Sequence, residues 1–215
     1  MMSEITYRQI KKDEFKPCNE LNFEAFKDYP VYHVFEMEPE EKLNNFNKSL
    51  MGCQLYEGLV KDTAFVAERD NEILSVAVIQ RPDHKGSSVP EYFLYGAFSV
   101  IRYGGFKNTF GFLDMVDRFN VPHVEFAKKN PNTWNLELLF VNKKYHGQGI
   151  GSRMINECVV PYVKKNGGEY LTLITNKEKN VHFYEKNGFD ILQHDDLIYN
   201  NKQINNWTFI RNFKD

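Results

Sequence analysis

The segment WNLELLFVNKKYHGQGIGSRMINECV, residues 134–159, joins an apolar run to a helical pattern through a glycine-rich turn. Gly147, Gly149 and Gly151 fall within five positions, directly before the helical spacing begins. The first N–H groups of a helix lack partners within the helix, and the helix dipole makes that end electropositive. Glycines let a bulky anion approach these N–H groups. A diphosphate fits this turn, although a tight strand-to-helix connection alone explains it equally well.

Two common phosphate-binding motifs do not account for the glycine turn. No Gly-Lys-Ser/Thr follows it, so it is not a P-loop. Its glycines are spaced one residue short of GxGxxG, and no acidic residue ends the next expected strand, so a dinucleotide fingerprint does not fit.

The periodicity on either side of the turn alternates between strand and helix. We expect strands at 5–10, in two runs within 63–82 around Asp70-Asn71, at 132–141 and 169–175, and as two strands after 189 that turn at Asn200-Asn201. We expect helices at 12–26, 38–58, 91–129, 151–166 and 176–189, with an aromatic loop at 28–36 and a polar loop at 84–90. This order predicts an α/β fold with a mixed sheet.

Several local features refine these expectations. The 91–129 helix is expected to break at Gly104-Gly105 and again near Pro122, and Pro161 to bend or shorten the 151–166 helix. Alternation in the 132–141 strand predicts Asn135, Glu137 and Leu139 on one face, and Leu136, Leu138 and Phe140 on the other.

A second motif, NVHFYEKNGF at 180–189, follows one strand and half a helix downstream. Together the two motifs resemble the acyl-coenzyme A binding elements of the GCN5-related N-acetyltransferase (GNAT) superfamily. The resemblance covers about residues 132–213, and the aromatic loop and helical insert resemble the puromycin N-acetyltransferase-like branch. It implies a single domain over 1–215, with 84–131 as a helical insert and 132–213 as the acyl-coenzyme A binding and C-terminal part. The implied sheet is GNAT-like, mixed and mostly antiparallel, with helices on both faces.

The resemblance also implies the residues that bind acetyl-coenzyme A, the expected cosubstrate. His146, Gly149 and Gly151 stand at the family positions Arg/Gln, Gly and Gly/Ala, and His146 departs from the usual residue. The Leu139 N–H would polarise the thioester carbonyl, and 139–141 would pair with the pantetheine amides. The implied set is Leu139, Phe140, Val141, His146, Gly147, Gln148, Gly149, Ile150, Gly151, Ser152, Asn180 and Tyr184.

Two residues, Tyr184 and Glu137, are expected to be catalytic. Tyr184 lies four positions after Asn180, so the two share a helical face. The resemblance implies that Tyr184 is the general acid for the thiolate, and its alternative is a core aromatic. Glu137 lies among apolar neighbours, where burial raises a carboxyl pKa and suits a general base. Its alternatives are an ion-paired carboxylate and a water chain as the base.

Composition excludes some functions. The net charge of −2 gives no reason to expect nucleic acid or an anionic membrane surface. The histidines have no metal-ligand spacing, so no metal is expected. Cys18, Cys53 and Cys158 are read as reduced thiols, and the first ten residues lack signal-peptide features, so a cytoplasmic location is expected.

We therefore expect an acetyl-coenzyme A-dependent N-acetyltransferase that acetylates a primary amine of a small molecule by direct attack in a ternary complex. A protein or peptide N-acetyltransferase and a non-catalytic acyl-coenzyme A binding module are the alternatives. The acceptor, the acyl-chain preference and a homodimer stay open. Seven ring-bearing residues are candidates for the wall of the acceptor pocket, with ordinary core packing as their alternative. They are Tyr32, His33 and Phe35 in the loop, and Tyr92, Tyr95, Phe98 and Tyr103 in the insert.

Overall fold

The computed structural model describes residues 4–61, 63–84 and 86–214, and contains a seven-stranded sheet. The strands are β1 (Thr6–Gln9), β2 (Ala64–Arg69), β3 (Glu72–Gln80), β4 (Thr133–Val141), β5 (Tyr170–Thr175), β6 (Asp190–Tyr199) and β7 (Lys202–Asn212). Their order in the sheet is β1-β2-β3-β4-β5-β7-β6, and every neighbouring pair is antiparallel except β4 and β5. The expected mixed, mostly antiparallel sheet is confirmed.

Two tight turns join antiparallel strands at the positions that the sequence indicates. Asp70 and Asn71 connect β2 to β3 with φ of 54° and 61°. Asn200 and Asn201 connect β6 to β7 with φ of 48° and 60°. Two successive residues with positive φ are typical of the hairpin turns whose twist matches that of the strands, and Asn and Asp tolerate this conformation well.

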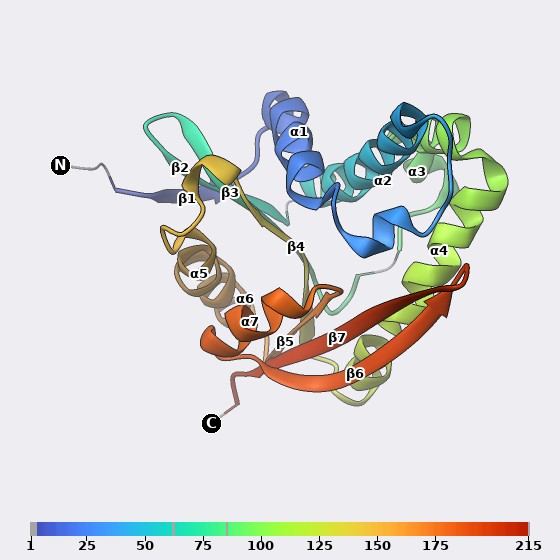
Figure 1. The fold of residues 1–215 in the computed structure, drawn as a ribbon. Coiled ribbons are helices and arrows are strands. Elements are labelled where there is room, and N and C mark those ends of the chain that lie inside the picture. The colour runs from blue at the N-terminus through green and yellow to red at the C-terminus, as the bar shows by residue number, and fades with distance from the viewer. Residues whose placement is uncertain (1–3, 62, 85, 215) are drawn as a thin grey trace.

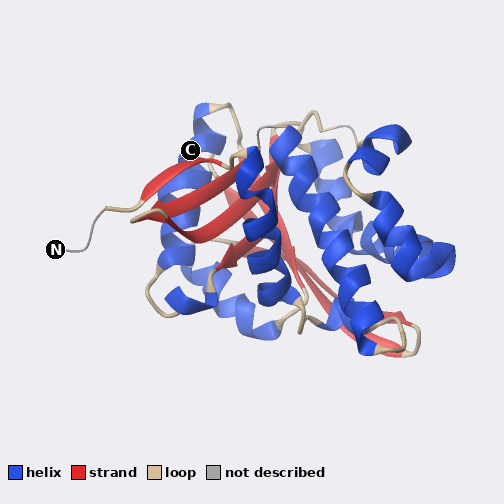
Figure 2. Cartoon of the chain, turned by 90° about the horizontal axis from the view of Figure 1, so that it is seen from above, coloured by secondary structure: helices blue, strands red, loops and turns tan. Residues whose placement is uncertain are grey.

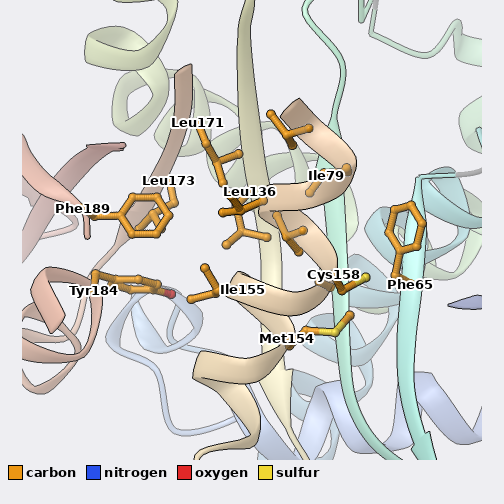
Figure 3. Packing of buried hydrophobic residues seen from close by; sticks show 14 of the residues in the cluster. Phe65, Ile79, Leu136, Met154, Ile155, Cys158, Leu171, Leu173, Tyr184 and Phe189 are labelled. Atoms are coloured by element: carbon orange, nitrogen blue, oxygen red, sulfur yellow. The ribbon is translucent and has the colours of Figure 1, made fainter. Parts of the chain in front are cut away.

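Helices cover both faces of the sheet (Figures 1 and 2). The main helices are α1 (Phe15–Phe26), α2 (Glu40–Val60), α3 (Val89–Leu94), α4 (Ala97–Lys129), α5 (Ile150–Arg153), α6 (Val160–Lys165) and α7 (Val181–Lys186). Short 3₁₀ turns lie at Lys12–Glu14, Pro30–His33, Lys143–Tyr145 and Glu178–Asn180. One face packs on the helical segment that runs from α5 to α6, through Met154, Ile155 and Val159, and the other packs on α1 and α2 through Cys18 and Leu55. Figure 3 shows the first cluster, in which Ile155 faces Leu136 and Tyr184 lies beside Phe189.

Pro161 does not end the helix that follows the glycine turn. A π-helical turn, Met154–Val159, joins α5 to α6, so residues 150–165 form one continuous helical segment. The Val160 N–H bonds to the Ile155 carbonyl five residues back. This wider turn gives the proline ring room beside the preceding backbone, and Pro161 lies in the first turn of α6, where a missing N–H costs least.

The helical insert consists of α3 and α4. Gly105 has φ of 67° inside α4, so the expected break at Gly104-Gly105 is confirmed. The expected break near Pro122 is wrong, because α4 continues through it to Lys129. Pro122 is buried, and the Asn206 side chain of β7 donates a hydrogen bond to the Phe119 carbonyl at 3.1 Å, in the turn that precedes the proline.

The β6–β7 hairpin reaches across the molecule to the insert (Figure 1). The Tyr199 hydroxyl donates to the Gly111 carbonyl of α4 at 2.7 Å. Asn200 and Lys202 donate to the carbonyls of Val34 and His33 at 3.2 and 2.8 Å. The hairpin tip, the aromatic loop and α4 therefore hold one another in place. Among the helices that the structure describes, none is both long enough and apolar enough to cross a membrane.

Candidate active site

The parallel strands β4 and β5 separate halfway along their length. They pair from Thr133 opposite Tyr170 to Leu136 opposite Leu173, and no further. A cavity of about 100 Å³ lies where they part, bordered by Glu137, Leu138 and Leu139 of β4 and by Ile174 and Thr175 of β5. The second half of β4 thus presents one edge to an open gap.

The backbone direction of β4 determines which N–H groups face this gap. The Asn142 N–H bonds to Leu74 of β3 at 2.8 Å. Because N–H groups alternate sides along a strand, those of Leu139 and Val141 lie on the side away from β3. The Val141 carbonyl is bonded to the His146 ring at 3.0 Å, consistent with this alternation. The Leu139 N–H is therefore directed toward the gap.

A β-bulge at Glu137 overturns the predicted alternation of β4. Val78 of β3 lies opposite Leu138, but the next residue, Ile79, lies opposite Leu136, so Glu137 is the extra residue. Leu136 consequently packs with the α5–α6 cluster, whereas Leu138 packs with the α1–α2 cluster. Leu139 returns to the α5–α6 side. Leu136 and Leu138 therefore do not share a face as predicted, and neither do Glu137 and Leu139.

The bulge places the Glu137 carboxylate between β4 and α2. Gln54 of α2 donates to Glu137 Oε1 at 2.6 Å, and Asn135 donates to Oε2 at 2.9 Å. Among the described residues no cation forms an ion pair with it, so its alternative role as an ion-paired carboxylate is not found. Burial raises the Glu137 pKa above its ordinary value, and the two amide hydrogen bonds oppose this rise.

A second, larger cavity of about 540 Å³ opens on the other side of Glu137. It is lined by the following residues: Gln54, Glu57, Gly58, Lys61, Thr63, Val78, Ile79, Gln80, Arg81, Asp83, His84 and Glu137. Most of its charges are already paired, since Lys61 contacts Glu57 at 3.0 Å and Arg81 contacts Asp83 at 3.4 Å. Gln54 and Glu137 border both cavities. Glu137 therefore stands where a molecule in the larger cavity would meet one in the gap.

Tyr184 borders the same small cavity as Glu137. Its ring packs against Phe189 and Phe209, at centroid distances of 5.9 and 5.5 Å, and it also lines the smaller cavity (Figure 3). It is therefore both a core aromatic and a residue of the site. Burial raises the pKa of its phenol, so the hydroxyl keeps its proton at neutral pH.

Asn180 lies in the short 3₁₀ turn between β5 and α7. Its Nδ2 donates to the hydroxyls of Tyr29 and Thr175 at 2.8 and 2.9 Å. Tyr29 and Thr175 line the smaller cavity with Tyr184. The structure thus places Glu137, Leu139 and Tyr184 at the smaller cavity, and Asn180 bonds to two residues that line it.

The glycine turn leads from the gap to the start of α5. Gly147 and Gly149 have φ of 76° and 72°, a conformation that favours glycine, and a Cβ at either position would meet no atom within 4 Å. Gly151 lies against the Phe183 ring, 3.1 Å from where its Cβ would be. His146, Gly147, Gln148 and Gly149 are exposed, whereas Ile150 is buried and anchors the turn. The exposed backbone ahead of the helix can receive a diphosphate, which the expected acetyl-coenzyme A carries.

Only part of the predicted aromatic acceptor wall is found at the two cavities. Tyr32 lines the smaller one. Phe35 is buried against Phe46 and Tyr199, and Tyr95 is buried against Tyr56, so these are core residues. Phe98 is 66% exposed on the surface of α4. The presence of aromatic residues in a loop or an insert does not by itself separate a cavity wall from a core or a surface.

Sequence reasoning missed several polar residues of the site. Gln54 and Glu57 lie in α2, whose apolar spacing predicts a helix but gives its polar residues no role. His84 lies in a loop. Asn135 was placed on the Glu137 face, but no role was derived for it. Their relation to Glu137 depends on how α2 packs on β4, which no local signal carries. In the described residues, no group of three or more His, Cys, Asp or Glu side chains is arranged to hold a metal ion.

Comparisons with known proteins agree with this geometry. Residues 61–191 match the acetyltransferase (GNAT) domain family. The polyamine N-acetyltransferase of Drosophila melanogaster, which forms N-acetylagmatine, has a TM-score of 0.68 at 15% identity, covering 98% of this chain and 100% of that chain. An agmatine N-acetyltransferase gives a TM-score of 0.68 at 13% identity with the same coverage. The Thermoplasma acidophilum PaiA N-acetyltransferase, in complex with coenzyme A, gives 0.58 at 14% identity, again covering 98% and 100%. At these identities the solved structures show a shared fold.

Proposed function

This chain belongs to the GNAT acetyltransferase family, whose members use acetyl-coenzyme A. From that premise we propose that it acetylates the primary amine of a small molecule, by direct attack of the amine on acetyl-coenzyme A in a ternary complex. The observation that carries the proposal is the position of Glu137. Its carboxylate borders both the gap between β4 and β5 and the larger cavity. An amine in the larger cavity would meet the acyl group at this one residue.

The residues of the gap suit the binding of acetyl-coenzyme A, which supplies an activated acetyl group. The Leu139 N–H would polarise the thioester carbonyl, and residues 139–141 would pair with the pantetheine arm as an added strand would. The N–H groups of the glycine turn, from His146 to Ser152, would hold the diphosphate. Asn180, fixed by Tyr29 and Thr175, would orient the pantetheine arm.

Glu137 and Tyr184 would move the protons. The amine arrives as an ammonium ion. Glu137, which has a raised pKa and no ion-pair partner among the described residues, would accept its proton. A raised pKa makes it a stronger base in its ionised form, and Gln54 and Asn135 keep that form accessible. Tyr184, at the same small cavity, keeps its proton at neutral pH and would donate it toward the departing sulfur. The neutral amine attacks once its proton has passed to Glu137.

The shape of the site favours a small acceptor over a peptide. The larger cavity has the volume of an ordinary small-molecule pocket. Two structures of similar fold are described as N-acetyltransferases of small amines, one of polyamines and one of agmatine. Similarity to the puromycin N-acetyltransferase-like branch, a cytoplasmic location and a homodimer remain parts of this proposal.

The proposal is tested by a screen of acceptors with acetyl-coenzyme A, reading the release of free thiol. The panel contains agmatine, polyamines, arylalkylamines, puromycin and a set of peptides with free α-amino or lysine groups. Turnover is expected with one or more small amines and not with the peptides. Turnover with peptides alone would favour the protein acetyltransferase. Binding of acetyl-coenzyme A with no turnover on any acceptor would favour a non-catalytic module.

A further inference from the structure

A chain of polar side chains crosses one face of the sheet and ends at Glu137. His123 of α4 lies 2.6 Å from the hydroxyl of Thr172 on β5, measured from Nδ1 to Oγ1. The Thr172 hydroxyl lies 3.3 Å from Asn135 Oδ1 on β4, and Asn135 Nδ2 donates to Glu137 Oε2 at 2.9 Å. The chain thus links the helical insert to the carboxylate through two neighbouring strands.

The middle of this chain is fully enclosed. Thr172 is 0% exposed and Asn135 is 4% exposed. A buried amide or hydroxyl lowers stability unless it is hydrogen-bonded, and an apolar pair would fill the same space at less cost. Here each polar side chain bonds to the next, so the polar residues are retained at a position where packing alone does not need them.

The single hydroxyl proton of Thr172 gives the chain a direction. If His123 carries its proton on Nδ1, it donates to Thr172, which can then donate to Asn135 Oδ1 or to the Trp134 carbonyl at 3.1 Å. With Oδ1 engaged, the Asn135 amide keeps Nδ2 toward Glu137. If His123 Nδ1 instead accepts, it takes the one Thr172 proton, and Asn135 Oδ1 loses its donor. The arrangement with Nδ1–H is the one in which every bond points toward the carboxylate.

We propose that His123, Thr172 and Asn135 are positioning residues that fix the Glu137 carboxylate and set its affinity for a proton. This inference rests on the proposed function in one respect, which is that Glu137 serves as the base. None of the three residues lines either cavity, so a segment of the insert that touches neither substrate would control the reaction.

Other ionisable groups near the chain are few. Glu57 raises the Glu137 pKa by repulsion, and the phenols of Tyr32 and Tyr92 interact with the same carboxylate. His84, which also lines the larger cavity, has a pKa lowered chiefly by burial. Burial is the cause that lowers the pKa of His123, so its ring is neutral near pH 7 and has one N–H to place. None of these groups replaces the bond from Asn135.

The test breaks the chain at Thr172 and restores it at the same position. Thr172→Val removes the hydroxyl with little change of shape, and Thr172→Ser keeps it. In Thr172→Val the Asn135 amide is no longer held, so the ionised form of Glu137 loses a donor and the Glu137 pKa rises by about one unit. Thr172→Ser should leave the pKa near that of the wild type. The same contrast in the Glu137 pKa is expected at His123. His123→Leu removes the donor, whereas the amide of His123→Asn can donate from the position of Nδ1.

Two readouts separate this inference from the proposed function. The first is a carboxyl ¹³C NMR titration of protein labelled at the glutamate side-chain carboxyl, with the Glu137 signal assigned by Glu137→Gln. The second is the acidic limb of kcat/KM against pH. A rise in the Glu137 pKa and a matching upward move of the limb support the inference. An NMR rise with an unmoved limb supports the chain but removes Glu137 as the base. An unchanged Glu137 pKa in both Thr172→Val and His123→Leu overturns the inference. If Thr172→Val does not fold, the His123→Leu variant decides alone, because His123 lies at the half-buried end of the chain and its replacement disturbs the core less.

Discussion

Gln54 and Glu137 are 83 positions apart in the chain, and the amide nitrogen of Gln54 lies 2.6 Å from Glu137 Oε1. This bond joins α2 to the bulge of β4. It is made by two residues that line both cavities. A charged acceptor strengthens a hydrogen bond, so the bond favours the ionised carboxylate against the effect of burial.

Replacing Gln54 should therefore alter the acid–base behaviour of Glu137. Gln54→Leu keeps most of the volume but removes the donor, so the Glu137 pKa should rise and the acidic limb of kcat/KM should move to higher pH by about one unit. Gln80→Leu is the matched control, because Gln80 lines the larger cavity without a hydrogen bond to Glu137. Equal shifts in both variants would attribute the change to cavity polarity instead.

Glu137→Gln tests the base itself. Positioned proton transfer contributes about 10²–10⁴-fold, so a loss of kcat/KM in that range is expected below the pKa of the free amine. The deficit should shrink as the pH rises, because the amine then loses its proton to solvent. Steady-state kinetics across pH measure this. A deficit that is the same at every pH would point to lost binding and not to lost base assistance.

The same carboxylate predicts a slope in stability. The Glu137 pKa is raised in the folded state above the ordinary value of the unfolded chain, near 4.3. Between these two pKa values the unfolded chain binds fewer protons than the folded protein. The stability that Glu137 contributes is therefore complete below its unfolded pKa and is lost as the pH rises through its folded pKa. Denaturant titrations of wild type and Glu137→Gln should show this loss in the wild type only. Parallel curves for the two proteins would contradict the raised pKa.

Tyr184→Phe tests the proton donor. The ring packs against Phe189 and Phe209 and is retained, so folding should change little. Turnover should fall by about 10²–10⁴-fold while the affinity for acetyl-coenzyme A stays nearly constant. Asn180→Ala is the contrasting variant, since it should weaken cosubstrate binding more than it slows the bound complex. A fully active Tyr184→Phe enzyme would leave Tyr184 as a core aromatic only.

Gly149→Asp tests the diphosphate site, and Gly167→Asp is its control. The two glycines have similar φ, 72° and 77°, and neither would bring a Cβ within 4 Å of another atom. Backbone strain should therefore be alike, but only residue 149 lies before the start of α5. Acetyl-coenzyme A should raise the melting temperature of the wild type and of Gly167→Asp, and bind Gly149→Asp at least about tenfold more weakly. Equal binding by both variants would move the diphosphate away from this turn.

The sequence by itself determined the elements and their order. Paired positive-φ residues such as Asn200-Asn201, alternating strands and the Gly149 turn are local signals, because a turn or a helix start depends on a few consecutive residues. It also identified Glu137 and Tyr184 as the residues to examine. The break predicted at Pro122 did not occur: α4 continues to Lys129, and Asn206 of β7 donates a hydrogen bond to the Phe119 carbonyl in the turn before the proline.

Only the tertiary structure decided how Glu137 is held. One extra residue in β4 moves Leu136 to the face opposite to Leu138, the face on which Leu139 lies. The bulge is fixed by the pairing with β3, which no periodicity in β4 reveals. Gln54 comes to the carboxylate from α2 and His123 connects to it from α4, both through packing between segments far apart in the chain. Local sequence encodes the conformation of each segment. Contacts between segments depend on all of them folding together, and these contacts set the environment in which the carboxylate works.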